Sequence, residues 1–273
     1  MRFAGKVAVV TGSGRAGGLG EGIAHRLAAE GATVVIADIG GSRDAATPGD
    51  MVGGSAEMQA IAAALPHGGS TFVCDVRDPV AVRALAAHAR DTHGGLDIWV
   101  NNAGIGYIMK PLLEVSADDW RAVIDVNLTG AWYGLQAAAE IMVAQGRGGR
   151  IINIASQAAK SGFPHAQAYT ASKHGLVGLV RSAAIELGPR GITVNNVCPN
   201  HVTTGLGKWQ NEHFAAVQGV TVDEYLARMA ARIPMGRPGL PSDTAAAVAF
   251  LCSDEAIYIT GESMNVSGGE EPH

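Results

Sequence analysis

The sequence has few cysteines and no long apolar run, and each shortage excludes a class of protein. The three cysteines, Cys74, Cys198 and Cys252, are far apart and form no Cys-x-x-Cys pair. A disulfide framework and a zinc site are therefore disfavoured, no metal is expected, and a reducing cytoplasm is the expected location. No run of about 18 apolar residues is present, so no membrane span is predicted. The first residues also lack the apolar core of a signal peptide.

The sequence also lacks an excess of positive charge. Lys and Arg number 20 against 25 Asp and Glu, which gives a formal net charge of −5. Binding to nucleic acid or to an anionic membrane is therefore not expected. Apolar residues make up 47% of the chain and glycines number 37, enough for a large core and many tight turns. These values favour a single domain over residues 1–273 that acts on a small molecule.

Short apolar runs alternate along the chain with longer stretches that have helical spacing. Such alternation predicts one doubly wound α/β domain, a parallel sheet of seven strands with helices on both faces. The expected strands are 7–11, 33–38, 71–75, 97–101, 150–155, 193–198 and 263–266. The expected helices are 20–30, 81–92, 118–143 and 169–187.

Two segments interrupt this alternation. Residues 40–55 are rich in Gly, Ser, Asp and Pro and are expected to form a long loop. Residues 205–240 carry Trp209, Phe214 and Tyr225 at no strand period. A long insertion beyond the sheet often forms a lid or a substrate wall, and we expect this one to close over bound substrate. The alternative is a helical hairpin whose aromatic residues fill a small separate core.

A glycine-rich loop follows the first expected strand. Its glycines match the Gly12-x-Gly14-x-x-Gly17 fingerprint of dinucleotide-binding (Rossmann) domains, in which backbone N–H groups approach the pyrophosphate. The next strand ends in Asp38, at the spacing expected of a carboxylate that binds ribose hydroxyls. An ordinary surface turn is the alternative, and a P-loop is excluded because no Lys-Ser/Thr follows the glycines.

Two residues bear on the choice of cofactor in opposite senses. The Asp38 carboxylate repels a 2′-phosphate and so favours NAD, whereas Arg15 in the glycine loop is of the type that holds this phosphate in NADP. Asp38 carries more weight because the strand end fixes its position. NAD is therefore the expected cofactor, and Arg15 is expected to be a solvated charge in a mobile loop.

A tyrosine and a lysine share one face of the helix expected at 169–187. Tyr169 and Lys173 are four residues apart, and Ser156 follows a strand 13 residues before the tyrosine. A nearby ammonium favours the phenolate, so we expect Lys173 to lower the tyrosine pKa from its usual value of about 10. Tyr169 would then exchange a proton with an alcohol. By itself, the Tyr-x-x-x-Lys spacing also fits an ordinary amphipathic helix.

Polar and glycine residues gather where the expected strands end, which is the edge at which open α/β sheets bind ligands. They are Gly12, Asp38, Asp75, Asn101, Ser156 and Pro199.

With these residues, the sequence resembles the classical short-chain dehydrogenase/reductase family from Lys6 to Gly269. The resemblance implies a catalytic tetrad of Asn127, Ser156, Tyr169 and Lys173. Ser156 would hold the substrate oxygen, Tyr169 would exchange its proton, Lys173 would bind the nicotinamide ribose, and Asn127 would hold a water of the proton relay. The resemblance also implies cofactor contacts from Gly12, Gly14, Gly18, Leu19, Asp38, Asp75, Val76, Asn102, Ala103, Gly104, Tyr169, Lys173, Pro199, Val202 and Thr204. Asp75 and Val76 would meet the adenine, and Val202 and Thr204 the nicotinamide carboxamide.

Two positions depart from the family pattern. Five residues separate Gly12 from Gly18, two more than is usual, so the sequence does not assign each glycine to a phosphate. The usual Pro-Gly after the sixth strand is Pro199-Asn200, and Asn tolerates the left-handed backbone better than most residues. Asn200 is thus a candidate contact to substrate or cofactor.

The motifs at 233–238, Asp243 and 258–261 are most similar to those of polyol and secondary-alcohol dehydrogenases. An NADPH-dependent carbonyl or 3-oxoacyl-thioester reductase is the alternative enzyme, and a non-catalytic dinucleotide sensor is the alternative of another class. His165, His174 and His201 are expected to be packed or solvated, with His201 the candidate exception beside the nicotinamide. The resemblance further implies a homotetramer assembled through 118–143, 169–187 and 263–266.

Overall fold

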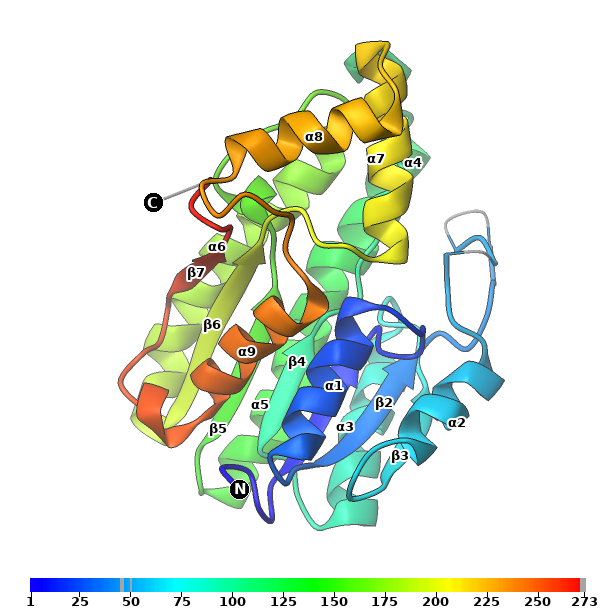
Figure 1. Ribbon diagram of the computed structural model, residues 1–273. Coiled ribbons are helices and arrows are strands. Elements are labelled where there is room, and N and C mark those ends of the chain that lie inside the picture. The colour runs from blue at the N-terminus through cyan, green and yellow to red at the C-terminus, as the bar shows by residue number, and fades with distance from the viewer. Residues whose placement is uncertain (45–46, 50, 271–273) are drawn as a thin grey trace.

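The strands of the central sheet are short runs of branched and apolar residues, buried on both faces. The computed structural model describes residues 1–44, 47–49 and 51–270 (Figure 1). All neighbouring strands pair in parallel, in the order β3-β2-β1-β4-β5-β6-β7. The strands are β1 (Val7–Thr11), β2 (Thr33–Asp38), β3 (Gly69–Val73), β4 (Ile98–Asn101), β5 (Gly149–Ile154), β6 (Ile192–Pro199) and β7 (Ser263–Val266).

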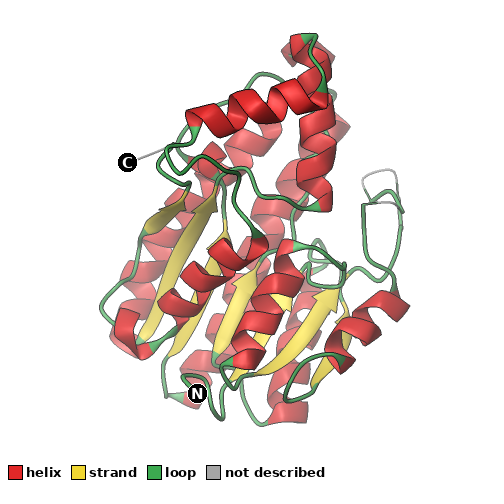
Figure 2. Ribbon diagram, in the orientation of Figure 1, coloured by secondary structure: helices red, strands yellow, loops and turns green. Residues whose placement is uncertain are grey.

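Helices cover both faces of this sheet, as Figure 2 shows. The larger ones are α1 (Leu19–Ala29), α2 (Ser55–Ala63), α3 (Pro79–His93), α4 (Ala117–Ile124), α5 (Gly130–Gln145), α6 (Gln167–Leu187), α7 (Gly205–Gln218), α8 (Val222–Arg232) and α9 (Pro241–Cys252). Short 3-10 turns lie at Leu112–Glu114, Gln157–Ala159, Gly188–Arg190 and Asp254–Ala256. Within the described residues, no helix is both long enough and apolar enough to cross a membrane.

Alternate residues of each strand pack on opposite faces and divide the core into two layers. In β1, Ala8 and Val10 join the layer beneath α1, α2 and α9, whereas Val7 and Val9 join the layer beneath α3, α5 and α6. Trp99 of β4 is fully buried in the second layer. Burial on both faces explains why these strands lack the apolar–polar alternation of an exposed sheet.

A ladder of asparagine side chains crosses the sheet near the carboxyl ends of its strands. The Asn101 amide donates to Asn153 Oδ1 at 2.8 Å, and the Asn153 amide donates to Asn196 Oδ1 at 3.1 Å. Asn196 in turn donates to Ser263 Oγ at 3.0 Å, and the Trp99 indole N–H donates to Asn101 Oδ1 at 2.6 Å. The ladder joins β4, β5, β6 and β7 below the edge where ligands bind, with its amides satisfied inside the core.

The seven predicted strands are all present, with ends that differ by at most two residues. The predicted helix at 118–143 is wrong in one respect, because a π-helical turn, Asp125–Thr129, separates α4 from α5. Helices α2 and α9 were not predicted, since their Ala-rich segments follow loops without a clear periodic pattern. Residues 45, 46 and 50 of the predicted loop 40–55, like 271–273, lie outside the described residues.

Residues 205–240 contain the helices α7 and α8, which stand above the carboxyl ends of the strands (Figure 1). Thr204 caps α7 by accepting a hydrogen bond from Gly207 N, and Thr221 caps α8 in a capping box. Tyr225 and Phe214 stack with ring centroids 6.4 Å apart inside a small separate core. These two aromatic residues thus fill a small core, as the helical-hairpin alternative expects, and they also line the cleft described below.

Candidate active site

The strand order changes direction between β1 and β4, and a cleft of about 420 Å³ opens above the strand ends there. Three of the four predicted tetrad residues line it, namely Ser156, Tyr169 and Lys173. The predicted cofactor residues that line it are Gly12, Gly18, Leu19, Asp38, Asp75, Val76, Asn102, Ala103, Gly104, Tyr169, Lys173, Pro199, Val202 and Thr204. Gly14 and Asn127 are not part of the lining.

Glycines in the loop after β1 allow close backbone contacts that side chains would prevent. Gly12 has a φ of +64°, and a Cβ there would lie 2.6 Å from Ala103 Cα. A Cβ on Gly20 would lie 2.4 Å from the Gly12 carbonyl oxygen. The N-cap of α1 is Gly18, which has no side chain to bond the N–H groups of the first turn. The two extra residues are accommodated in a turn closed by Gly18 N donating to Arg15 O at 3.2 Å.

Asp38, at the end of β2, faces the cleft while two backbone groups hold its carboxylate. Gly14 N and Ile39 N each donate to it at 2.8 Å. Burial raises its pKa, the two backbone hydrogen bonds oppose this shift, and the nearby Glu57 carboxylate adds to it. Each carboxylate oxygen has a further lone pair, so Asp38 still has capacity to accept hydrogen bonds from a ligand.

Asp75 lies two residues past β3 and is paired with an arginine that the sequence did not single out. Arg77 donates through Nε to Oδ1 at 3.0 Å and through Nη2 to Oδ2 at 2.7 Å. Burial raises the pKa of Asp75, but the Arg77 hydrogen bonds and charge outweigh it and hold the pKa below its usual value. Arg77 also donates to Asp44 at 2.7 Å, so it ties the loop after β2 to this end of the cleft.

Arg15 does not behave as the predicted solvated charge. Its Nη1 donates to the Met51 carbonyl at 3.1 Å, and its Nη2 lies 2.6 Å from where a Cβ on Gly205 would stand. The guanidinium thus spans from the glycine loop to the loop after β2 and to the start of α7. A side chain of this length is half-buried here because three segments meet around it.

Ser156, Tyr169 and Lys173 come together because α6 packs against the end of β5. Lys173 is 5% exposed, and its ammonium donates to the Ile154 carbonyl at 2.8 Å. The Lys173 Nζ lies 5.5 Å from the centroid of the Tyr169 ring. Ser156 lies two residues past the end of β5 and hydrogen-bonds to Tyr169. Tyr169 and Lys173 are four residues apart on α6, and both line the cleft, as predicted.

The expected lowering of the Tyr169 pKa is not found in this structure. Burial raises the Tyr169 pKa, and the hydrogen bond from Ser156 opposes that rise without overcoming it. Burial also lowers the pKa of Lys173, to about 8. The physical reason is that the same desolvation disfavours both charged forms, the phenolate and the ammonium.

Asn127 lies behind the wall of the cleft, in the π-helical turn. Its side chain is 1% exposed, accepts from Ile105 N at 2.8 Å and donates to Ile105 O at 2.9 Å. The amide also donates to Ser172 Oγ at 3.2 Å. Asn127 therefore supports the segment that follows β4, and its side-chain donors and acceptors are used within the protein.

Asn200 and His201 extend the wall on the side of β6. The Asn200 amide donates to the Glu270 carboxylate, while its Oδ1 is buried with no hydrogen-bond partner among the described residues. Burial lowers the pKa of His201, and the Glu270 carboxylate opposes this shift. His201 does line the cleft, whereas His174 is exposed and bonds to the Thr170 carbonyl.

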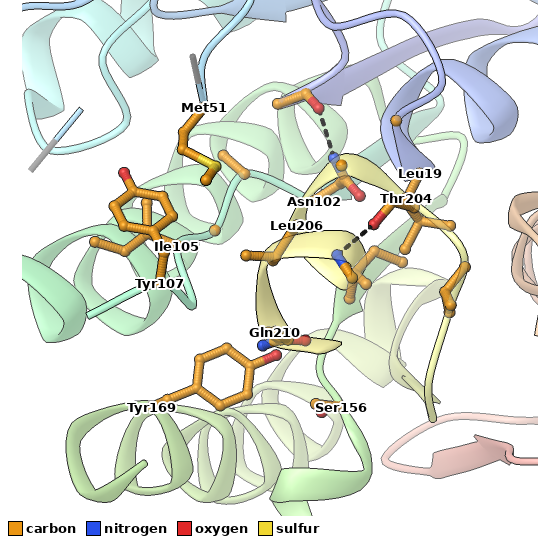
Figure 3. A pocket seen from close by; sticks show the side chains of 18 of the residues that line it. Leu19, Met51, Asn102, Ile105, Tyr107, Ser156, Tyr169, Thr204, Leu206 and Gln210 are labelled. Carbon is orange, nitrogen blue, oxygen red and sulfur yellow. Dashed lines mark hydrogen bonds between the residues drawn. The ribbon is translucent and has the colours of Figure 1, made fainter. Parts of the chain in front are cut away.

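Part of the wall that faces Tyr169 comes from residues outside the predicted catalytic and cofactor-binding sets. Gln210 of α7 and Tyr107 of the loop after β4 both line the cleft (Figure 3). Trp209 stacks on His213 with ring centroids 5.1 Å apart and meets Tyr107 edge to face. The position of Tyr107, three residues after Gly104, was the available signal. No sequence signal identifies which face of α7 is turned to the cleft.

The buried Lys173 ammonium predicts a specific pH dependence of stability. Its pKa is about 8 in the folded protein and about 10.4 when unfolded, so the unfolded state binds more protons between these values. The free energy of unfolding of the wild type should therefore rise with pH, relative to Lys173→Met, by up to about 1.4 kcal/mol per pH unit. Urea unfolding of both proteins at pH 7, 8 and 9 measures this difference.

A matched control is Lys208→Met, which removes an ammonium whose side chain is 80% exposed. Its unfolding free energy should follow the wild type at all three pH values. Parallel curves for the wild type and Lys173→Met would show that Lys173 does not change its protonation on folding.

Known proteins resemble this chain over nearly its whole length. A family model described as "Enoyl-(Acyl carrier protein) reductase" matches residues 12–271. L-2,3-butanediol dehydrogenase of Corynebacterium glutamicum is 37% identical over 264 residues, which is 97% of this chain and 98% of that protein. Galactitol 2-dehydrogenase of Agrobacterium fabrum is 36% identical over 269 residues, 98% of each chain.

A solved structure agrees with these relatives. Carveol dehydrogenase from Mycobacterium avium, in complex with NAD, superimposes with a TM-score of 0.90 at 34% identity over 98% of each chain. From the fold, the cleft and these matches, the chain belongs to the classical short-chain dehydrogenase/reductase family of oxidoreductases.

Proposed function

We propose that the protein is an NAD-dependent dehydrogenase that interconverts a secondary alcohol or polyol and the corresponding ketone. The observation that carries this proposal is the meeting of Ser156, Tyr169 and Lys173 at one wall of the cleft above the strand ends. A hydroxyl, a phenol and a buried ammonium at one point are suited to hold an alcohol oxygen and to move its proton. The names of the butanediol and galactitol dehydrogenases support an alcohol substrate.

The lining of the cleft fits a dinucleotide. The tight approach of Gly12 to Ala103, which a Cβ would prevent, leaves backbone close to the cleft where a pyrophosphate would lie. Asp38 has free lone pairs for ribose hydroxyls, and Val202 and Thr204 lie on the side where α7 begins. NAD⁺, when bound, supplies the acceptor for the hydride that leaves the carbinol carbon.

Tyr169 would exchange the proton of the alcohol. With its pKa raised by burial, it is a phenol at neutral pH, the form that donates a proton to a ketone oxygen. In the direction of alcohol oxidation it must become a phenolate, which the Ser156 hydroxyl and the Lys173 ammonium both favour. Lys173 is mostly protonated at pH 7, because its pKa is about 8.

An NADPH-dependent carbonyl or 3-oxoacyl-thioester reductase is the second candidate, and Arg15 is the residue that favours it. Its guanidinium lies in the cleft near Asp38, where a 2′-phosphate would be placed. Asp38 outweighs it, since a buried carboxylate at the end of β2 repels that phosphate. A non-catalytic dinucleotide sensor has no need of Tyr169 and Lys173 together.

The first prediction concerns the proton carrier. Tyr169→Phe should lower kcat for alcohol oxidation by about 10²- to 10⁴-fold, because the ring still packs but has no hydroxyl to exchange a proton. The Kd for NAD⁺, measured by fluorescence titration, should change little. Tyr258→Phe makes the same change on a fully exposed tyrosine and should retain wild-type turnover. Near-normal turnover of Tyr169→Phe on any secondary alcohol would contradict the assignment.

The second prediction concerns cofactor choice. The wild type should have a higher kcat/KM with NAD⁺ than with NADP⁺, and Asp38→Ser should narrow this ratio by at least about tenfold by removing a charge near the 2′-phosphate. Asp118→Ser, which removes a carboxylate that is 92% exposed, should leave the ratio unchanged. A wild type that is faster with NADP⁺ would show that Arg15 outweighs Asp38.

The third prediction concerns assembly. We propose a homotetramer that uses α4, α5, α6 and the region of β7, and exposed apolar side chains on these elements support it. They are Trp120, Trp132 and Ile185. Light scattering at micromolar concentration should give about four times the 28.0 kDa mass of the chain, and a monomeric mass would contradict the proposal.

We further propose that α7 and α8 close over bound substrate and exclude water.

A further inference from the structure

The wall of the cleft that faces the catalytic tyrosine is largely apolar, and Gln210 brings an amide group into it. Figure 3 shows the Gln210 side chain extending from α7 beside the hydroxyl end of the Tyr169 ring. Apolar residues that line the cleft include Ile105, Met109, Phe163, Leu206 and Phe214. An amide among such side chains is the kind of group that orients a ligand.

Gln210 and Tyr169 are close neighbours, because both contact Gly106. A Cβ on Gly106 would lie 3.1 Å from Gln210 Nε2 and 3.1 Å from Tyr169 Cε2. The amide and the phenol ring therefore flank one residue of the loop after β4. Two oxygen-binding groups so close together match a ligand with oxygens on neighbouring carbons.

The amide is oriented by a hydrogen bond to the backbone. Gln210 Nε2 donates to the Gly106 carbonyl at 3.3 Å, and a carbonyl oxygen can only accept. This bond determines which end of the amide is the nitrogen. The other end, Oε1, accepts no hydrogen bond from the residues that the structure describes. Gln210 therefore presents a hydrogen-bond acceptor to the cleft.

The helix that carries Gln210 is held in place on both sides of it. Thr204 caps α7 through Gly207 N at 3.1 Å, and Trp209 packs between His213 and Tyr107. Because its neighbours are ordered by packing, Gln210 needs little reorganisation to bind a ligand, and such preorganisation strengthens discrimination.

We propose that Gln210 is the specificity-determining residue that accepts a hydrogen bond from a second hydroxyl, on the carbon next to the one oxidised. The preferred substrates are then vicinal diols, and α-hydroxyketones in the reverse direction. This inference rests on the proposed dehydrogenase function. The hydroxyl bound by Gln210 does not react, and its O–H bond is retained throughout. Since Oε1 is an acceptor, an ether oxygen at the same position is not recognised.

The test compares three alcohols that differ at one position: 2,3-butanediol, 2-butanol and 3-methoxy-2-butanol, each supplied as all its stereoisomers. In the wild type, kcat/KM with NAD⁺ should be about tenfold or more higher for the diol than for either analogue, because each analogue leaves Oε1 without a donor. Gln210→Met keeps the length of the side chain and removes the amide. It should lower kcat/KM for the diol by about tenfold and change that for 2-butanol by less than about twofold.

The matched control is Gln59→Met, the same change at an exposed residue of α2 that does not line the cleft, which should keep the wild-type preference. An equal loss on all three alcohols in Gln210→Met would assign Gln210 a structural role and overturn the inference. An unchanged preference for the diol would overturn it as well. If the wild type oxidises no secondary alcohol with either nicotinamide cofactor, the proposed function itself fails, an outcome distinct from a uniform loss in the variant.

Discussion

The hydrogen bond from the Lys173 ammonium to the Ile154 carbonyl is the contact on which the active site depends. With a length of 2.8 Å and a lysine that is 5% exposed, it joins the second turn of α6 to the last residue of β5. Ser156 follows that residue by two, and Tyr169 lies one helical turn before the lysine. A buried ammonium with a single protein acceptor is costly. The strain is confined to the point where a negatively charged phenolate and a bound ligand would relieve it.

The sheet edge beneath this contact is itself held by polar groups. The asparagine ladder from Asn101 through Asn153 and Asn196 lies across three neighbouring strands and keeps their carboxyl ends together. Above the edge, α7 supplies an apolar wall with the Gln210 amide, and Arg15 meets its first residue. We therefore propose that the sheet edge positions the reacting groups, while the helices inserted after β6 select which molecules reach them.

Local pattern was sufficient for the seven strands and for the spacing of the proposed catalytic residues. The seven strands follow from runs of branched apolar residues, and Tyr169 and Lys173 follow from a four-residue spacing within one helix. The break at Asp125–Thr129 was not predictable in this way, because the apolar pattern runs through the π-helical turn. Helices α2 and α9 were missed because neighbouring elements, rather than their own periodicity, stabilise Ala-rich segments. The partners of Asp75 and Arg15 were missed because they lie in the irregular loops after β3 and after β2, respectively.

The sequence by itself determined the seven strands, the glycine loop, the acidic residue at the end of β2 and the residues proposed to carry the chemistry. Each of these follows from interactions within a few residues along the chain. Tertiary structure decided the rest: that burial raises the pKa of Tyr169 and lowers that of Lys173, that Asn127 supports the wall, and that Gln210 faces the phenol. Desolvation and contact between distant segments arise only when the chain is packed, and for that reason no spacing in the sequence encodes them.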